Sequence, residues 1–158
     1  MIDESRFTAE ALRMQDMLYR TAVSILRHDA DAQDAVQQAL ENAWKHRHRV
    51  EPDFFAPWLM RIVINCCKEQ LRKRSWETAS DQMDLYGGET PPPDPDLADA
   101  LARLPIKYRM PLLLHYLEGF SLEEIAQTLR LPMNTVKSRM RRARLKLRAE
   151  WNEAEDAR

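Results

Sequence analysis

The side chains best suited to binding an anionic partner are concentrated in residues 120–147. Seven Lys or Arg residues lie between positions 137 and 148. Ahead of them, Ser121 and Glu124 form the S-x-x-E pattern of a helix start, and Pro132 ends a short turn. Gly119, just before Ser121, suits a left-handed end of the preceding helix. A capped helix, a short turn and a longer basic helix predict a helix-turn-helix that places its second helix in a DNA major groove.

The predicted second helix has two chemically distinct faces. An apolar stripe at helical spacing is expected to pack on its neighbours, and it consists of Val136, Met140, Ala143 and Leu147. The opposite face carries donors that can reach base edges and phosphates from one rigid rod, namely Asn134, Lys137, Ser138, Arg141 and Arg142. Arg139, Arg144 and Lys146 lie on the flanks, where phosphate contacts are expected. A merely solvated basic face is the alternative interpretation.

A second polar stripe lies in the first half of the chain. Arg61, Asn65, Lys68 and Arg72 fall at i, i+4, i+7 and i+11, which places them on one face of a helix, and Lys73 and Arg74 continue this stripe. Just upstream, Phe54 and Phe55 could stack on unpaired bases, and Trp58 is predicted to be a core residue. These positions predict a surface along which a single DNA strand could lie.

Helical periodicity extends through most of the chain. Three helices are predicted in the first half, at residues 9–27 after Thr8 as N-cap, 31–45 and 57–74. The first of these places Leu12, Leu18, Ile25 and Leu26 toward a core. Four shorter helices are predicted in the second half, at 96–104, 106–117 with a kink or a late start at Pro111, 122–129 and 132–151. Only three glycines are present, so the fold class is all-α.

Charge is sorted along the chain, although the formal net charge is only −1. Residues 1–76 hold 12 basic and 11 acidic groups, residues 77–100 hold none and 7, and residues 101–150 hold 11 and 4. The acidic middle also contains Gly87, Gly88 and a run of prolines, a composition typical of a flexible linker. We therefore predict two small helical domains, 1–76 and 101–158, joined by the linker 77–100.

Composition excludes several other classes of protein. No apolar run approaches the roughly 18 residues of a membrane span, and the acidic N-terminal sequence is unlike a secretory signal. Cys66 and Cys67 are adjacent, a spacing that fits reduced thiols better than a disulfide. A cytoplasmic protein is expected.

The residues argue against two alternative functions. A DNA-binding repressor or activator would ordinarily need a dimer interface to read two half-sites, and no long apolar heptad is present. A metal site would use His46, His48, Cys66 and Cys67, but neither H-x-H nor C-C has the usual spacing of structural zinc ligands. His115 is predicted to be packed among apolar residues. No catalytic constellation is found, and we expect neither a cofactor nor a metal and no enzymatic activity.

Two blocks of sequence resemble a known family. The first is D-A-Q-D-A-V-Q-Q-A-L-E-N-A-W followed by W-L-M-R-I-V-I-N-C-C-K-E-Q-L-R-K-R. The second is L-P-I-K-Y-R-M-P-L-L-L-H-Y-L-E-G-F-S-L-E-E-I-A followed by T-V-K-S-R-M-R-R-A-R. In this order, and separated by an acidic linker, they resemble a bacterial RNA polymerase sigma factor of the extracytoplasmic-function (ECF) group.

The resemblance implies a region 2 bundle that binds core RNA polymerase and melts the minus-ten element, and a region 4 helix-turn-helix that reads the minus-thirty-five element. By this resemblance the clamp helices of the largest subunit would contact Asp34, Gln37, Gln38, Glu41 and Asn42. The melted strand would contact Phe54, Phe55, Arg61, Asn65, Lys68 and Arg72. Upstream duplex DNA would contact Asn134, Thr135, Lys137, Ser138, Arg139, Arg141 and Arg142.

The resemblance also implies further partners and one point of difference. The polymerase flap and an anti-sigma protein are expected partners, and the polymerase would supply the chemistry. The family typically carries Gly where this chain has Asn134, so an altered backbone or an additional DNA contact is expected there.

Overall fold

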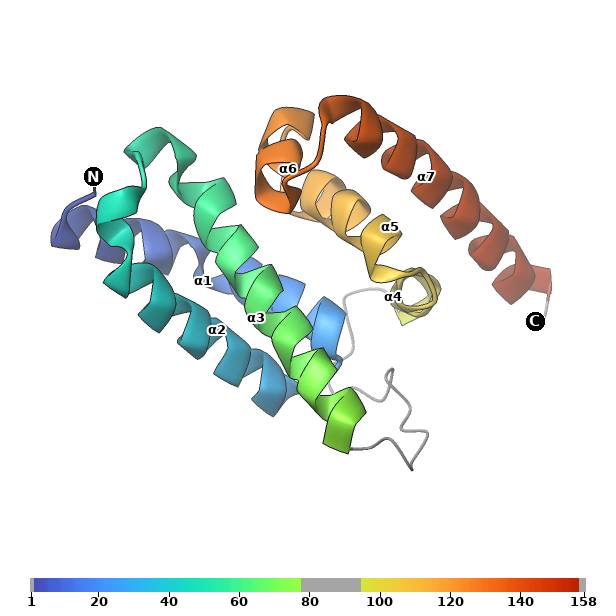
Figure 1. Cartoon of the computed structure of the whole chain (residues 1–158). Helices are drawn as coiled ribbons and strands as arrows, with labels where there is room; N and C mark the ends of the chain where they lie inside the picture. Colours follow the sequence, from blue (N-terminus) through green and yellow to red (C-terminus); the bar gives the residue numbers. More distant parts are fainter. Residues whose placement is uncertain (1, 78–94, 157–158) are drawn as a thin grey trace. The chain divides into compact units, whose positions relative to one another are not determined.

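A computed structural model describes residues 2–77 and 95–156, and the described residues form helices joined by short turns (Figure 1). Contacts divide the chain into two compact units, Met1–Thr90 and Pro91–Arg158, which we call the N-terminal and C-terminal units. Most of the predicted linker, residues 78–94, lies outside the described residues. No strand occurs in the described part of the chain, in agreement with the all-α prediction.

Three long helices build the N-terminal unit: α1 (Glu4–Leu26), α2 (Asp29–Lys45) and α3 (Phe55–Glu77). Each packs against the other two (Figure 1). The inner face of α2 is made of small side chains, all fully buried, at Ala32, Ala35, Ala39 and Ala43. Because helices approach more closely where the contacting side chains are small, this face allows α1 and α3 to meet over it. Leu18, Leu59 and Met60 fill the resulting core.

The first helix differs from its prediction at its start. The N-cap is Asp3, whose carboxylate Oδ1 accepts from the Arg6 backbone N–H at 2.8 Å. Thr8 lies inside the helix, where its hydroxyl donates to the Glu4 carbonyl at 2.9 Å, so the predicted cap was wrong. Leu12 was also wrongly assigned to the core, because its side chain is 66% exposed. The helix begins at Glu4 because Asp3, upstream of Thr8, supplies the N-cap.

The C-terminal unit consists of α4 (Pro95–Ala102), α5 (Ile106–Leu112), η3 (Leu113–Leu117), α6 (Leu122–Leu129) and α7 (Met133–Asp156). The long helix α7 contacts α4, α5 and α6 (Figure 1). The predicted apolar stripe of α7 is confirmed, because Val136, Met140 and Ala143 are buried and Leu147 is half-buried. The short helices therefore depend on α7 for most of their packing.

Arg109 is a buried cation that closes the end of α4. Only 4% of it is exposed, and its guanidinium donates to three backbone carbonyls. Nε donates to Leu101 at 3.0 Å, while Nη2 donates to Ala102 at 3.0 Å and to Leu104 at 2.9 Å. The last carbonyls of a helix have no partner within the helix, so one planar side chain here satisfies three acceptors at the α4–α5 junction.

The helix that contains Pro111 changes its winding after the proline. Residues Leu113–Leu117 form a π-helix, in which the Glu118 N–H donates to the Leu113 carbonyl at 3.2 Å. Proline has no N–H, and a wide turn of this kind accommodates a disturbed ladder of helical hydrogen bonds. Pro111 lies inside α5, which begins at Ile106, so a late start is wrong, and the change of winding begins two residues after the proline. The His115 ring Nδ1 lies 2.8 Å from the Phe120 carbonyl and ties the following turn to η3.

Candidate nucleic-acid interface

The turn between α6 and α7 fixes the direction of the basic helix. The predicted capping box is confirmed: the Glu124 N–H donates to Ser121 Oγ, and the Ser121 N–H donates to the Glu124 carboxylate, both at 3.1 Å. Gly119, just before it, has φ +73°, as its predicted left-handed position requires. At the other end of α6, Arg130 adopts φ 53° and its N–H donates to the Ala126 carbonyl. The helix-turn-helix predicted from the sequence is thus closed by local hydrogen bonds at both ends of α6.

The side chains predicted to read duplex DNA lie on the outer side of α7. Asn134, Lys137, Ser138, Arg141 and Arg142 are exposed, and Thr135 and Arg139 are half-buried. Among the residues whose side chains the structure describes, none of these cations forms an ion pair with an acid. Such a face presents several charged donors to solvent along one rod, the arrangement that phosphate and base contacts require.

Asn134 occupies an ordinary helical position. It is the second residue of α7, and positive φ angles at non-glycine residues occur, within the described chain, only at Arg27 and Arg130. The backbone here is therefore that of a normal first helical turn, and an asparagine is accommodated without strain.

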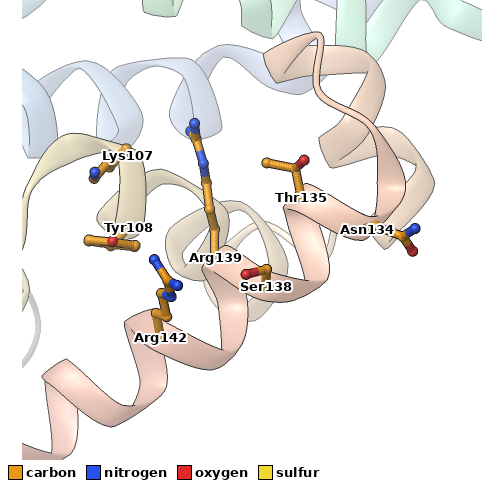
Figure 2. Close-up of a pocket in the computed structure, with 7 residues that line it drawn as sticks. All are labelled: Lys107, Tyr108, Asn134, Thr135, Ser138, Arg139 and Arg142. Atoms are coloured by element: carbon orange, nitrogen blue, oxygen red, sulfur yellow. The ribbon is translucent and has the colours of Figure 1, made fainter.

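An open recess of about 360 Å³ lies beside this face, between α5 and α7. Figure 2 shows its lining, which comprises Lys107 and Tyr108 from α5 together with Asn134, Thr135, Ser138, Arg139 and Arg142 from α7. A hydrogen bond with Arg142, with smaller contributions from nearby cations, lowers the pKa of the Tyr108 hydroxyl below its usual value. Lys107 and Tyr108 were not identified as candidates from the sequence, because 26 positions separate Tyr108 from Asn134 and no local pattern joins them.

The predicted single-strand surface on α3 is partly occupied by internal contacts. Asn65, Lys68 and Arg72 are exposed, and Arg61 is half-buried. Arg72 pairs with Glu69 one turn earlier, and this bond lowers the pKa of Glu69. Beyond the stripe, Arg74 pairs with Asp31 of α2 and donates to the Leu26 carbonyl of α1 at 3.1 Å. Arg74 therefore ties the three helices together rather than extending the surface.

The two phenylalanines before α3 have different environments. Phe54 is 52% exposed, at the end of the short 3-10 turn Pro52–Phe54. Phe55 is buried, and its ring packs against Phe7 with centroids 5.5 Å apart and against Trp58 at 5.9 Å. The predicted contact of Phe55 with the melted strand conflicts with this burial, whereas Phe54 is accessible to an unpaired base.

The predicted polymerase-binding side chains share the outer face of α2. Asp34, Gln37, Gln38 and Glu41 are exposed, whereas Asn42 is half-buried. The Gln38 amide donates to Asn42 Oδ1 at 3.2 Å, and the Asn42 amide lies 3.9 Å from Cys66 Sγ. Asn42 therefore links this face to α3, while its four neighbours remain available to a partner.

The residues considered for metal binding do not form a site in the described ranges. Within residues 2–77 and 95–156, no group of three His, Cys, Asp or Glu side chains could hold a metal ion. Cys66 and Cys67 are free thiols, and burial raises the pKa of Cys67 to about 12. The Cys67 side chain is fully buried, whereas Cys66 is half-buried. Among the described helices, none is long and apolar enough to cross a membrane.

In comparison with known proteins, the two units match two family models, each of which describes one region of sigma-70. Residues 11–77 match sigma-70 region 2, and residues 96–147 match sigma-70, region 4. The ECF RNA polymerase sigma factor SigE of Mycolicibacterium smegmatis is 32% identical over 145 residues, covering 84% of this chain and 56% of that protein. The chain thus spans little more than half the length of that relative.

Two further relatives are covered over most of their length. The RNA polymerase sigma factor SigV of Bacillus subtilis is 32% identical over 130 residues, which cover 79% of this chain and 78% of that protein. Among solved structures, the sigma factor RpoE in complex with the anti-sigma factor NepR from Bartonella quintana superposes with a TM-score of 0.75 at 27% identity. That match covers 92% of this chain and 96% of the solved one.

Proposed function

The chain belongs to the extracytoplasmic-function group of bacterial RNA polymerase sigma factors, and we propose that it binds core RNA polymerase and directs it to specific promoters. The observation that carries this proposal is the exposed basic face of α7, which follows a capped helix and a short turn. In this role the N-terminal unit anchors on polymerase and holds the melted strand, while α7 enters the major groove of the upstream duplex.

Three surfaces serve these contacts. The outer face of α2, with Asp34, Gln37, Gln38 and Glu41, docks on the clamp helices of the largest subunit. The α3 stripe and Phe54 hold the minus-ten strand. Lys137, Arg141 and their neighbours on α7 contact the minus-thirty-five duplex.

An apolar groove in the C-terminal unit provides a site for the polymerase flap. It has a volume of about 310 Å³ and is lined by Leu97, Leu101, Leu112, Leu113, Tyr116, Leu117, Arg144 and Leu147. Tyr116 and Leu117 are more than half exposed. Arg144 donates to the Tyr116 hydroxyl at 3.1 Å, and both residues line the groove. An exposed apolar groove of this kind suits the apolar face of a partner helix.

Regulation by an anti-sigma protein follows from the same surfaces. The similar sigma factor RpoE was solved in complex with the anti-sigma factor NepR. A partner that covers the α2 face or the apolar groove would prevent polymerase binding. The chain itself performs no catalysis, because polymerase supplies the chemistry, and it acts in the cytoplasm, where polymerase is located.

Run-off transcription with core polymerase on a randomised promoter library tests this function. We expect the wild-type chain to select one class of promoter, and duplex binding by the chain alone to be weak. Transcription that is unchanged by the chain, together with tight binding to an operator without polymerase, would instead indicate an ordinary helix-turn-helix regulator.

Charge reversal at one exposed position tests the assigned role of α7. Arg141→Glu removes a donor from the base-facing side, and we expect promoter binding to fall about 10- to 100-fold while polymerase binding is retained. Arg103→Glu is the matched control, because Arg103 is an exposed cation at the end of α4 that pairs with Glu150 at 3.5 Å. Equal loss of promoter and polymerase binding in Arg141→Glu would indicate unfolding and contradict the assignment.

A further inference from the structure

The recess between α5 and α7 concentrates positive charge around one tyrosine. The Nζ atoms of Lys107 and Lys146 lie 5.0 and 5.5 Å from the centroid of the Tyr108 ring. Figure 2 shows Arg142 rising from α7 toward the same ring, with Lys107 beside it on α5. Tyr108 is only 7% exposed, so its ring is held in place between the two helices.

No acidic side chain among the described residues pairs with the cations of this recess. None of the seven lining residues is acidic, and among the described side chains Lys107, Arg139 and Arg142 form no ion pair. Like charges gathered at one site repel one another, and an anion placed between them removes that repulsion. The free recess is therefore electrostatically complementary to an anionic ligand.

The neutral lining residues favour a phosphate group over a simple ion. Thr135 and Ser138 contribute hydroxyl donors and Asn134 contributes an amide, next to the ammonium and guanidinium groups. Phosphate oxygens accept hydrogen bonds from all of these groups, and contacts to arginine are frequently bidentate. The Arg142 side chain points toward Tyr108 (Figure 2), whose hydroxyl interacts with its guanidinium.

We propose that this recess binds one backbone phosphate of duplex DNA, with Lys107 and Arg142 as charged donors and Tyr108 as a positioning residue. The DNA backbone is favoured as the source because the recess is continuous with the exposed face of α7. The assignment rests on the proposed function and extends it, since it adds α5, which lies outside the helix-turn-helix, to the DNA-binding surface.

A phosphate contact has a measurable signature that base contacts lack. Loss of a phosphate contact weakens binding equally for matched and mismatched sequences. Each such contact contributes about 0.9 to the slope of log K against log salt concentration. We expect Lys107→Gln, in holoenzyme bound to promoter duplex, to weaken binding about three- to five-fold and to reduce that slope by about 0.9. The preference for the promoter over a scrambled upstream element should not change.

Matched variants separate this site from general charge effects. Arg103→Gln removes one positive charge from the same unit outside the recess and should leave affinity and slope nearly unchanged. Lys107→Arg keeps the charge and should restore most of the binding. Tyr108→Phe keeps the ring but removes the hydroxyl partner of Arg142, and a loss of about two-fold is expected.

A neutral methylphosphonate, placed at single positions along the upstream duplex, locates the phosphate. At one position, the methylphosphonate should lower the affinity of the wild-type holoenzyme by the same factor as Lys107→Gln does. At that position it should not lower the affinity of the Lys107→Gln holoenzyme any further. Two results would overturn the recess as a phosphate site while leaving the sigma function intact. One is that Lys107→Gln and Arg103→Gln have the same affinity and salt slope. The other is that the losses caused by Lys107→Gln and by the methylphosphonate add at every position. A wild-type holoenzyme with no promoter preference would overturn both.

Discussion

The two units of this sigma factor use their basic side chains in different ways. In the N-terminal unit, arginines pair with acids of the same unit: Arg13 with Glu10, Arg47 with Glu4, Arg72 with Glu69 and Arg74 with Asp31. In the C-terminal unit, Lys137, Arg139, Arg141 and Arg142 form no ion pair with the side chains that the structure describes.

The two units differ in how many of their basic side chains are available to a partner, and not in how many basic residues they contain. Both units contain similar numbers of basic residues, but the N-terminal unit holds 11 acids in residues 1–76 against 4 in residues 101–150. Cations that are paired internally contribute to the fold, whereas cations without acidic partners remain free to neutralise phosphates. The unit that we propose reads intact duplex is therefore the one in which acids are scarce.

The largest expected effect comes from Arg109, a buried cation of the C-terminal unit that donates to backbone carbonyls. Arg109→Ala leaves three carbonyls without their charged donor, and we expect a loss of at least about 3 kcal/mol of stability in this unit. Hydrogen exchange followed by mass spectrometry should show faster exchange in α4 and α5 with α1–α3 unchanged.

Two controls accompany Arg109→Ala. Arg103→Ala removes an exposed arginine from the same junction and should cost less than about 1 kcal/mol. Arg109→Lys keeps the charge but lacks the planar fork, so it should recover only part of the stability. Full stability of Arg109→Ala would show that the contacts to the α4 carbonyls do not hold this unit together.

A smaller effect is expected from Arg74 in the N-terminal unit. Arg74→Ala removes the ion pair with Asp31 and the bond to the Leu26 carbonyl, and we expect a loss of about 1–2 kcal/mol by thermal unfolding. The neighbouring Lys73 is exposed, so Lys73→Ala is the matched control and should change stability little. If the two variants instead lose strand binding equally without destabilisation, Arg74 belongs to the DNA surface.

The smallest effect tests whether internal pairing limits the α3 stripe. Glu69→Gln releases Arg72 and should change stability little, because both side chains are exposed, while increasing holoenzyme affinity for a single-stranded minus-ten oligonucleotide about two-fold. Glu10→Gln releases Arg13 from a similar i,i+3 pair on α1 and should not change strand affinity. Weaker strand binding by Glu69→Gln would show that the pair orients Arg72 for DNA.

Local patterns predicted most of the helices and much of the candidate interface. The α6 bounds, the capping box at Ser121, the left-handed Gly119 and the buried stripe of α7 all follow from interactions within one or two turns of helix. The exposed face of α2 was predicted in the same way, because burial of its alanines at helical spacing leaves its polar side chains outside.

The errors arose where a residue's environment depends on distant segments. Phe54 and Phe55 are identical in type and adjacent, yet only Phe55 meets Phe7 of α1 and becomes buried. Leu12 shares the spacing of core residues but lies where no neighbouring helix covers it. Arg74 extends a basic run in sequence, but its partners are on α1 and α2.

The sequence by itself determined that the chain is helical, where its basic helix lies and which family it resembles. The tertiary structure decided which cations are available, placed Arg109 on the end of α4, and brought Lys107 and Tyr108 beside α7. The physical reason is range: helix formation and capping act over a few residues, whereas burial, pairing and recess formation depend on side chains that only packing brings together.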